Sequence, residues 1–143
     1  MILVDANVLI YAVDRDSAHH TRARRWLEAT LSGGEWIGLP WLVVLAFLRV
    51  TTHPRVMRKP LSAEDAIGYV DGWLRQPFVR LIGPGEAHWP VLRNLLQASG
   101  TAGNLTSDAH LAALAIEHGS LIASSDEDFR RFAGVTHVNP LKE

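Results

Sequence analysis

The chain has 143 residues, of which 48% are hydrophobic and 20% are charged, a balance typical of one globular domain rather than a disordered segment. The formal net charge of -1 excludes the broad positive field of a strongly basic nucleic-acid-binding protein, so any contact with nucleic acid needs a local patch. Cysteine is absent, which excludes disulfides, thiolate metal sites and cysteine nucleophiles, and we expect a reducing, cytoplasmic location.

No membrane segment is expected from the hydropathy pattern. The N-terminal apolar run lacks a basic segment and is interrupted by Asp5, so it does not resemble a signal peptide. The most apolar stretch, 37–50, is too short to span a bilayer and contains Pro40 and Arg49.

Short apolar runs rich in β-formers alternate with segments of helical periodicity. In chain order, the pattern predicts strand 2–4, helices 7–13 and 18–31, strand 36–39, helices 41–51 and 62–75, strand 78–82, helix 86–98, helix 108–118 capped by Thr106 or Ser107, strand 121–124, a helical turn or two over 126–132 and strand 136–138. This alternation predicts an α/β fold with three layers, in which helices cover both faces of a mainly parallel central sheet. Since no Pro/Gly-rich linker divides the chain, we expect a single domain over 1–143.

Three acidic residues fall at comparable places in this pattern. Asp5 follows the first strand, Asp108 opens a helix after a Gly-rich loop, and Asp126 follows the fourth strand, with Asp128 two residues later. Each also has a purely structural interpretation, because Asp is a preferred N-cap and complements the helix dipole in a first turn. However, strand-to-helix junctions of parallel units share one edge of the sheet, so these carboxylates are expected to meet there.

Carboxylates that meet in this way repel one another, and a bound cation relieves that repulsion. Ligation by carboxylate oxygens alone suits Mg²⁺ or Mn²⁺, and such a site activates water for attack on a phosphodiester. The motifs of competing chemistries are absent: the chain has no P-loop, no dinucleotide-binding glycine pattern, no nucleophile elbow and no H-E-x-x-H pair.

Three stretches resemble motifs of the VapC toxins, which are PIN-domain ribonucleases. The opening segment ILVDANVLIYA is similar to the first motif of that family, SDAHLAALA over 107–115 to the third, and SSDEDF over 124–129 to the last. The resemblance spans nearly the whole chain and implies a PIN-like fold.

The resemblance also implies roles for particular residues. Asp5 and Asp108 would be the principal Mg²⁺ or Mn²⁺ ligands, and Asp126 would complete the acidic cluster. Asn7 and Ser107 would support this cluster by hydrogen bonding, and Asp128 is expected to be a further supporting residue. The family further implies cleavage of RNA, a homodimer and neutralisation by a small VapB-like antitoxin, for which we expect a docking surface on the apolar helices near Trp26 and Trp41.

One position departs from the family pattern. The family usually carries a glutamate on the helix after the second strand, and Ala46 occupies that position here. The missing carboxylate favours a single metal ion over a pair. Arg49, on the same helical face, is a candidate contact for a substrate phosphate, although a salt bridge or a solvated helix end explains it equally well.

The leading hypothesis is therefore a metal-dependent endoribonuclease toxin in which Asp5, Asp108 and Asp126 serve catalysis. The main alternative is a catalytically silent PIN scaffold that acts by binding RNA or a partner, and the absent glutamate is its support. A nuclease acting on DNA is a third, weaker possibility. Candidate RNA contacts outside the cluster are the basic residues Arg22, Arg24, Arg25, Arg55, Arg58 and Lys59.

Overall fold

The computed structural model describes residues 1–100 and 102–142. Within these residues the chain forms one five-stranded sheet in the order β3-β2-β1-β4-β5, and every neighbouring pair of strands is parallel. The strands are β1 (Ile2–Val4), β2 (Ile37–Pro40), β3 (Val79–Ile82), β4 (Leu121–Ala123) and β5 (His137–Val138). The prediction of an α/β fold around a parallel sheet is confirmed.

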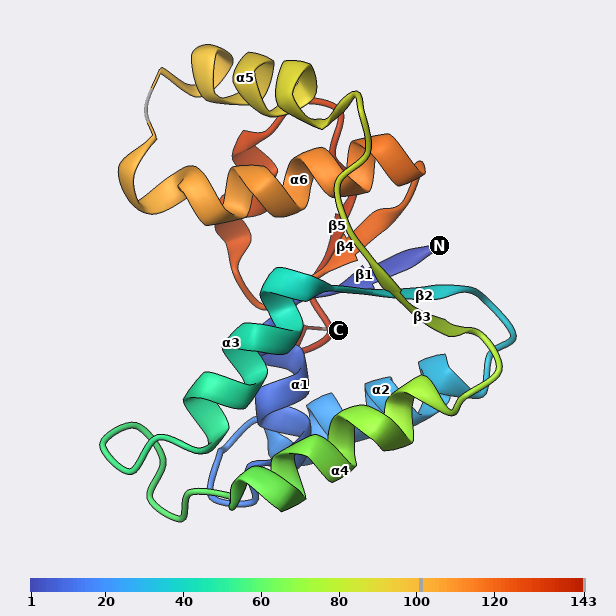
Figure 1. Ribbon diagram of the computed structural model, residues 1–143, viewed down its shortest axis with the longest axis vertical. Coiled ribbons are helices and arrows are strands. Elements are labelled where there is room, and N and C mark those ends of the chain that lie inside the picture. Colours follow the sequence, from blue (N-terminus) through green and yellow to red (C-terminus); the bar gives the residue numbers. More distant parts are fainter. Residues whose placement is uncertain (101, 143) are drawn as a thin grey trace.

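The helices lie close to the predicted ranges. They are α1 (Ala6–Val13), α2 (His20–Leu31), α3 (Trp41–Thr51), α4 (Ala63–Leu74), α5 (His88–Ser99) and α6 (Thr106–His118), with 3₁₀ turns η1 (Gly103–Leu105) and η2 (Glu127–Arg131). Figure 1 shows α5 and α6 on one side of the sheet and α1 to α4 on the other, so the molecule has three layers. None of the described helices is both long enough and apolar enough to cross a bilayer.

Local signals in the sequence account for several helix ends. Ser62 caps α4 by accepting a hydrogen bond from the backbone N–H of Asp65, as its spacing predicts. Gly119 ends α6 in the left-handed conformation with φ of 60°, which favours glycine.

The start of α6 differs from the prediction. Neither Thr106 nor Ser107 caps this helix; both lie in its first turn, and the residue before them, Leu105, has no side chain that could cap. The reason is that the 3₁₀ turn η1 feeds directly into α6, and Leu105 already has helical backbone angles. Asp108 consequently belongs to the first turn of α6 rather than to its first position.

The central strand β1 joins the N-terminal segment of the chain to β4, which lies more than one hundred residues later. It pairs with β4 in the register Leu3↔Ile122 and Val4↔Ala123. The backbone N–H of Asp5 continues this ladder by donating to the carbonyl of Ala123 at 2.9 Å. Because the strands are parallel, the segments that follow Val4 and Ala123 leave the same edge of the sheet.

Candidate active site

The first acidic residue, Asp5, is held by hydrogen bonds. Its Oδ1 accepts from the backbone N–H of Ala6 at 2.7 Å, which caps α1, and its Oδ2 accepts from the hydroxyl of Ser124 at 2.7 Å. Burial raises the pKa of Asp5, against the opposing effect of these hydrogen bonds. Asp5 therefore has both the structural role of a cap and a position at the carboxyl edge of the sheet.

Asn7 links the segments that follow β1 and β4. Its Nδ2 donates to the carboxylate of Asp5 at 3.3 Å and to the hydroxyl of Ser124 at 3.2 Å, while its Oδ1 accepts from the backbone N–H of Ser125. The supporting role expected for Asn7 is consistent with these contacts.

Ser124 is the residue at this edge that sequence reasoning missed. It is fully buried, and besides its bond to Asp5 its hydroxyl accepts from the backbone N–H of Asp126 at 3.0 Å. One hydroxyl thus orients two of the acidic segments. The sequence feature that could have identified Ser124 is its position, because it is a small polar residue between an apolar strand and an acidic turn.

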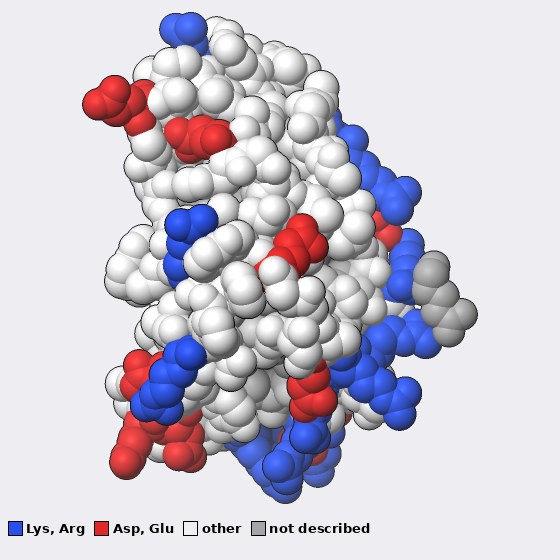
Figure 2. Space-filling model, turned by 90° about the vertical axis from the view of Figure 1, so that its right-hand side faces the viewer, with Lys and Arg blue, Asp and Glu red and all other residues white. Residues whose placement is uncertain are grey.

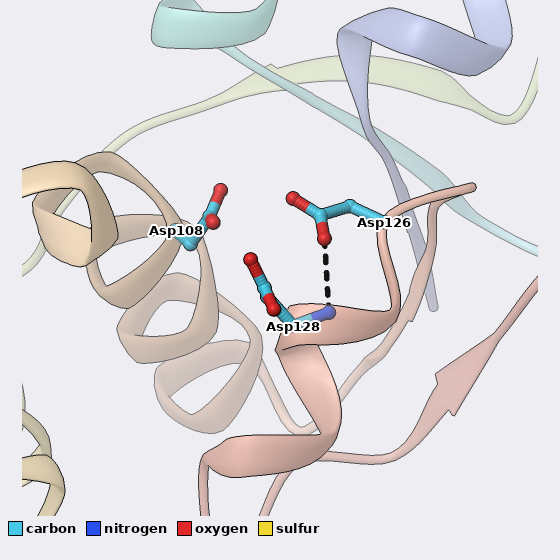
Figure 3. A group of neighbouring side chains, drawn as sticks. All are labelled: Asp108, Asp126 and Asp128. Atoms are coloured by element: carbon cyan, nitrogen blue, oxygen red, sulfur yellow. Dashed lines mark hydrogen bonds between the residues drawn. The ribbon is translucent and has the colours of Figure 1, made fainter.

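Three carboxylates converge in Figure 3, and they lie close enough to Asp5 to interact with its charge. Asp108 comes from the first turn of α6, and Asp126 and Asp128 come from the start of η2. One carboxylate oxygen from each of the three lies within 4.8 Å of the others. Asp126 also caps η2, since its Oδ1 accepts from the backbone N–H of Asp128 at 2.9 Å.

The neighbouring carboxylates add to the effect of burial on the pKa of Asp108. Burial, and then repulsion from Asp126 and the other neighbouring carboxylates, raises the pKa of Asp108 to about 6. A group of carboxylates with this mutual repulsion, half-buried and offering only oxygen atoms, fits a hard divalent cation such as Mg²⁺ or Mn²⁺.

The carboxylates that lie closest together are not the same three that were expected to bind the metal. Within the described residues, Asp5 is not part of the group of three, and Asp128 takes the third place. The physical reason is that the carboxylate of Asp5 is turned toward Ser124 and the backbone of α1. Asp5 nevertheless lies close enough for its charge to raise the pKa of Asp108.

Two other expected site residues lie apart from the cluster. Ser107 is exposed, and no hydrogen bond joins it to the acidic residues in the part of the chain that the structure describes. Arg49 is exposed in the last turn of α3, likewise without an ion pair to the described acidic residues. Ala46, at the usual glutamate position, is half-buried and packs against the core.

Comparisons with known proteins agree with the fold and the motifs. The PIN domain family model matches residues 2–135. Ribonuclease VapC37 of Mycobacterium tuberculosis is 46% identical over 140 residues, covering 98% of this chain and 97% of its own. Ribonuclease VapC33 of the same species is 44% identical over 143 residues and covers the whole of both chains.

The solved structures include VapBC2 from Rickettsia felis bound to a DNA fragment from its promoter. It has a TM-score of 0.71 at 17% identity, covering 97% of this chain and 98% of that one, which supports the fold alone. Family model, relatives and motifs agree, and the chain therefore belongs to the PIN-domain family and, within it, to the VapC group.

Proposed function

We propose that this protein is a metal-dependent endoribonuclease toxin of a VapBC-type toxin–antitoxin module, which hydrolyses RNA phosphodiester bonds with water as the nucleophile. The observation that carries the proposal is the convergence of Asp108, Asp126 and Asp128 beside Asp5 at the carboxyl edge of the sheet. Relatives of 44% and 46% identity over nearly the whole chain that are named ribonucleases support the choice of RNA.

The acidic cluster would hold Mg²⁺ or Mn²⁺. Asp108, Asp126 and Asp128 would supply oxygen ligands. Asp5 would either bind the ion as a further ligand or attract it through its negative charge without direct contact. When bound, such an ion would lower the pKa of a coordinated water molecule. It would also compensate the negative charge that develops on the phosphate. With Ala46 in place of the usual glutamate, we propose one ion rather than two.

Neighbouring side chains hold the carboxylates of the cluster in fixed orientations. Ser124 and Asn7 hold the Asp5 carboxylate in one orientation, and Ser124 also holds the turn that carries Asp126. Asp126 has one oxygen engaged in capping η2, so its other oxygen faces Asp108 and is the one available to a ligand or a proton. These contacts preorganise the carboxylates before substrate arrives.

We also propose a VapB-like antitoxin as the partner, a homodimer as the assembly and the cytoplasm as the location. Solved structures of the same fold include toxin–antitoxin complexes such as VapBC2. Of the two tryptophans expected at the antitoxin surface, Trp41 on α3 is 55% exposed, beside Leu45 at 58%. Trp26 packs partly against the core, so α3 is the stronger candidate surface.

The test is cleavage of total bacterial RNA by purified protein, free of antitoxin, in Mg²⁺ or Mn²⁺. We expect wild type to cleave, EDTA to stop cleavage, and Asp126→Asn to lose on the order of a hundredfold or more in rate, because its carboxylate is a ligand. Asp71→Asn, which neutralises an exposed carboxylate on α4, is the matched control and should retain full activity.

The alternative of a catalytically silent scaffold is favoured by Ala46, which removes one carboxylate from the family's usual set. It predicts that wild type and Asp126→Asn inhibit growth equally when expressed without antitoxin, and that neither cleaves RNA. Parallel digestion of DNA separates the ribonuclease from a DNA nuclease, since only the latter would degrade the DNA sample.

A further inference from the structure

The acidic cluster presents an electrostatic difficulty for an enzyme that acts on RNA. Asp5, Asp108, Asp126 and Asp128 together bring up to four negative charges to the place where an anionic phosphate must bind. A single divalent ion compensates two of them and leaves the site repulsive to phosphate. A second source of positive charge is therefore needed at the cluster, and Ala46 argues against a second metal ion.

The residue placed to supply this charge is Arg131. Its Nε lies 3.5 Å from Oδ1 of Asp128, one of the three converging carboxylates. The two residues are three positions apart in η2, and side chains at this spacing lie one above the other in a 3₁₀ helix. The guanidinium therefore lies at the rim of the cluster, and the Arg131 side chain is 62% exposed, open to a ligand from solvent.

The ion pair leaves most of the binding capacity of Arg131 free. A distance of 3.5 Å is longer than a good charge-assisted hydrogen bond, and it engages only Nε. Within the described residues Arg131 makes no hydrogen bond, so its remaining N–H donors can bind a phosphate in the forked geometry that guanidinium favours.

Neighbouring cations lack this placement. Arg130, the adjacent residue in η2, pairs with Glu127 at 2.9 Å, and Glu127 also pairs with Lys142. Glu127 is not part of the converging group. Figure 2 shows one face of the molecule, on which basic side chains gather toward one edge with acidic side chains among them.

We propose that Arg131 binds a phosphate group of the RNA at the acidic cluster and supplies the positive charge that a second metal ion would otherwise provide. This inference rests on the proposed ribonuclease activity. It assigns Arg131, rather than Arg49, as the substrate contact at the site.

The experiment compares Arg131→Gln with Arg130→Gln in two measurements on the purified full chain. The first is Mn²⁺ affinity by calorimetry without RNA. Removing a positive charge beside Asp128 should leave Mn²⁺ affinity unchanged or tighten it by up to about fivefold. The second is steady-state cleavage of an RNA that wild type cleaves, where kcat/KM should fall about tenfold or more.

The salt dependence of cleavage adds a third readout. Loss of one phosphate contact should reduce the slope of log kcat/KM against log salt by about 0.7 to 0.9 in Arg131→Gln. Arg131→Lys, which keeps the charge but not the fork, should recover part of the activity. Arg130→Gln should match wild type in all three measurements.

A fall in cleavage without a fall in Mn²⁺ affinity distinguishes substrate binding from a structural role. If Arg131→Gln weakens Mn²⁺ binding in parallel with cleavage, Arg131 only positions Asp128 and the proposal is overturned. It is also overturned if Arg131→Gln cleaves as well as Arg130→Gln. If wild type cleaves no RNA while binding Mn²⁺, the proposed function itself fails, and with it the role of Arg131.

Discussion

At the scale of single residues, Asp108 shows how the neighbouring carboxylates act on one another. Its carboxyl group is half-buried and faces Asp126 and Asp128, and its pKa is raised to about 6. A carboxyl group with a raised pKa in the folded chain stabilises the fold at low pH, and this contribution is lost as the pH rises through the folded value. Without metal, Asp108 therefore destabilises the fold near neutral pH.

Replacing Asp108 by Asn should stabilise the metal-free protein, because Asn is similar in size and has no charge to desolvate. In EDTA, the Tm of Asp108→Asn should exceed that of wild type by about 2 to 5 °C at neutral pH. The difference should grow between about pH 4 and pH 6 and stay constant above about pH 7.

The measurement is a series of thermal melts across this pH range, with Asp71→Asn as the control. The control should show no such pH-dependent difference, since Asp71 is exposed and far from the cluster in sequence. A Tm of Asp108→Asn that stays below wild type at every pH would contradict the electrostatic account of this residue.

At the scale of elements, a chain of partly buried polar side chains connects α5 to α6. Nδ1 of His88 lies 2.6 Å from the carboxylate of Glu117, and Nε2 of His88 lies 2.9 Å from Nδ1 of His110. Burial, and then the charge of His88, lowers the pKa of His110, which favours its neutral form. His88 thus spans two turns of the helix that carries Asp108 and fastens α5 to it.

His88→Ala should destabilise the fold by about 1 to 3 kcal/mol, because it leaves the buried Glu117 carboxylate without its imidazole partner. The measurement is urea unfolding at neutral pH. His118→Ala removes an exposed imidazole from the same helix and should have little effect.

A double variant tests the cause of this loss. Since Glu117→Gln removes the charge that His88→Ala leaves unpaired, the double variant should be more stable than the sum of the two single effects predicts. Simple additivity would mean that His88 stabilises the fold by packing alone.

The site is assembled from distant parts of the chain at the scale of the whole molecule. β1 brings Asp5 next to the segment after β4, and α6 places Asp108 opposite η2. Strand β1, at the start of the chain, pairs with β4 in its last third, and this pairing supports a single domain. The single domain over 1–143 stays a prediction. The acidic cluster forms only when the sheet and α6 are both folded.

Metal binding should consequently stabilise the entire fold. An ion that binds only the folded chain contributes about 2.7 kcal/mol at a concentration one hundred times its Kd. We expect Mn²⁺ to raise the urea midpoint of wild type without changing the m-value. Asp126→Asn should show much less of this shift, and an equal shift in both proteins would place the ion elsewhere.

Much of the fold followed from local patterns. The apolar run before Asp5, Ser62 before α4 and Gly119 after α6 depend on backbone geometry and short-range hydrogen bonds, which neighbouring residues determine. The start of α6 was mispredicted because η1 continues into the helix, and that geometry depends on how the whole segment packs rather than on Thr106 or Ser107.

By itself the sequence determined the α/β class, the parallel sheet and the acidic edge, because strand and helix periods and the order of elements are properties of the chain. Only the tertiary structure decided which carboxylates meet. In the folded chain Asp5 accepts a hydrogen bond from the buried Ser124, Asp128 lies within the cluster and Arg131 lies at its rim. These outcomes depend on side-chain directions and hydrogen bonds between residues more than one hundred positions apart, such as Asp5 and Ser124, which no local pattern records.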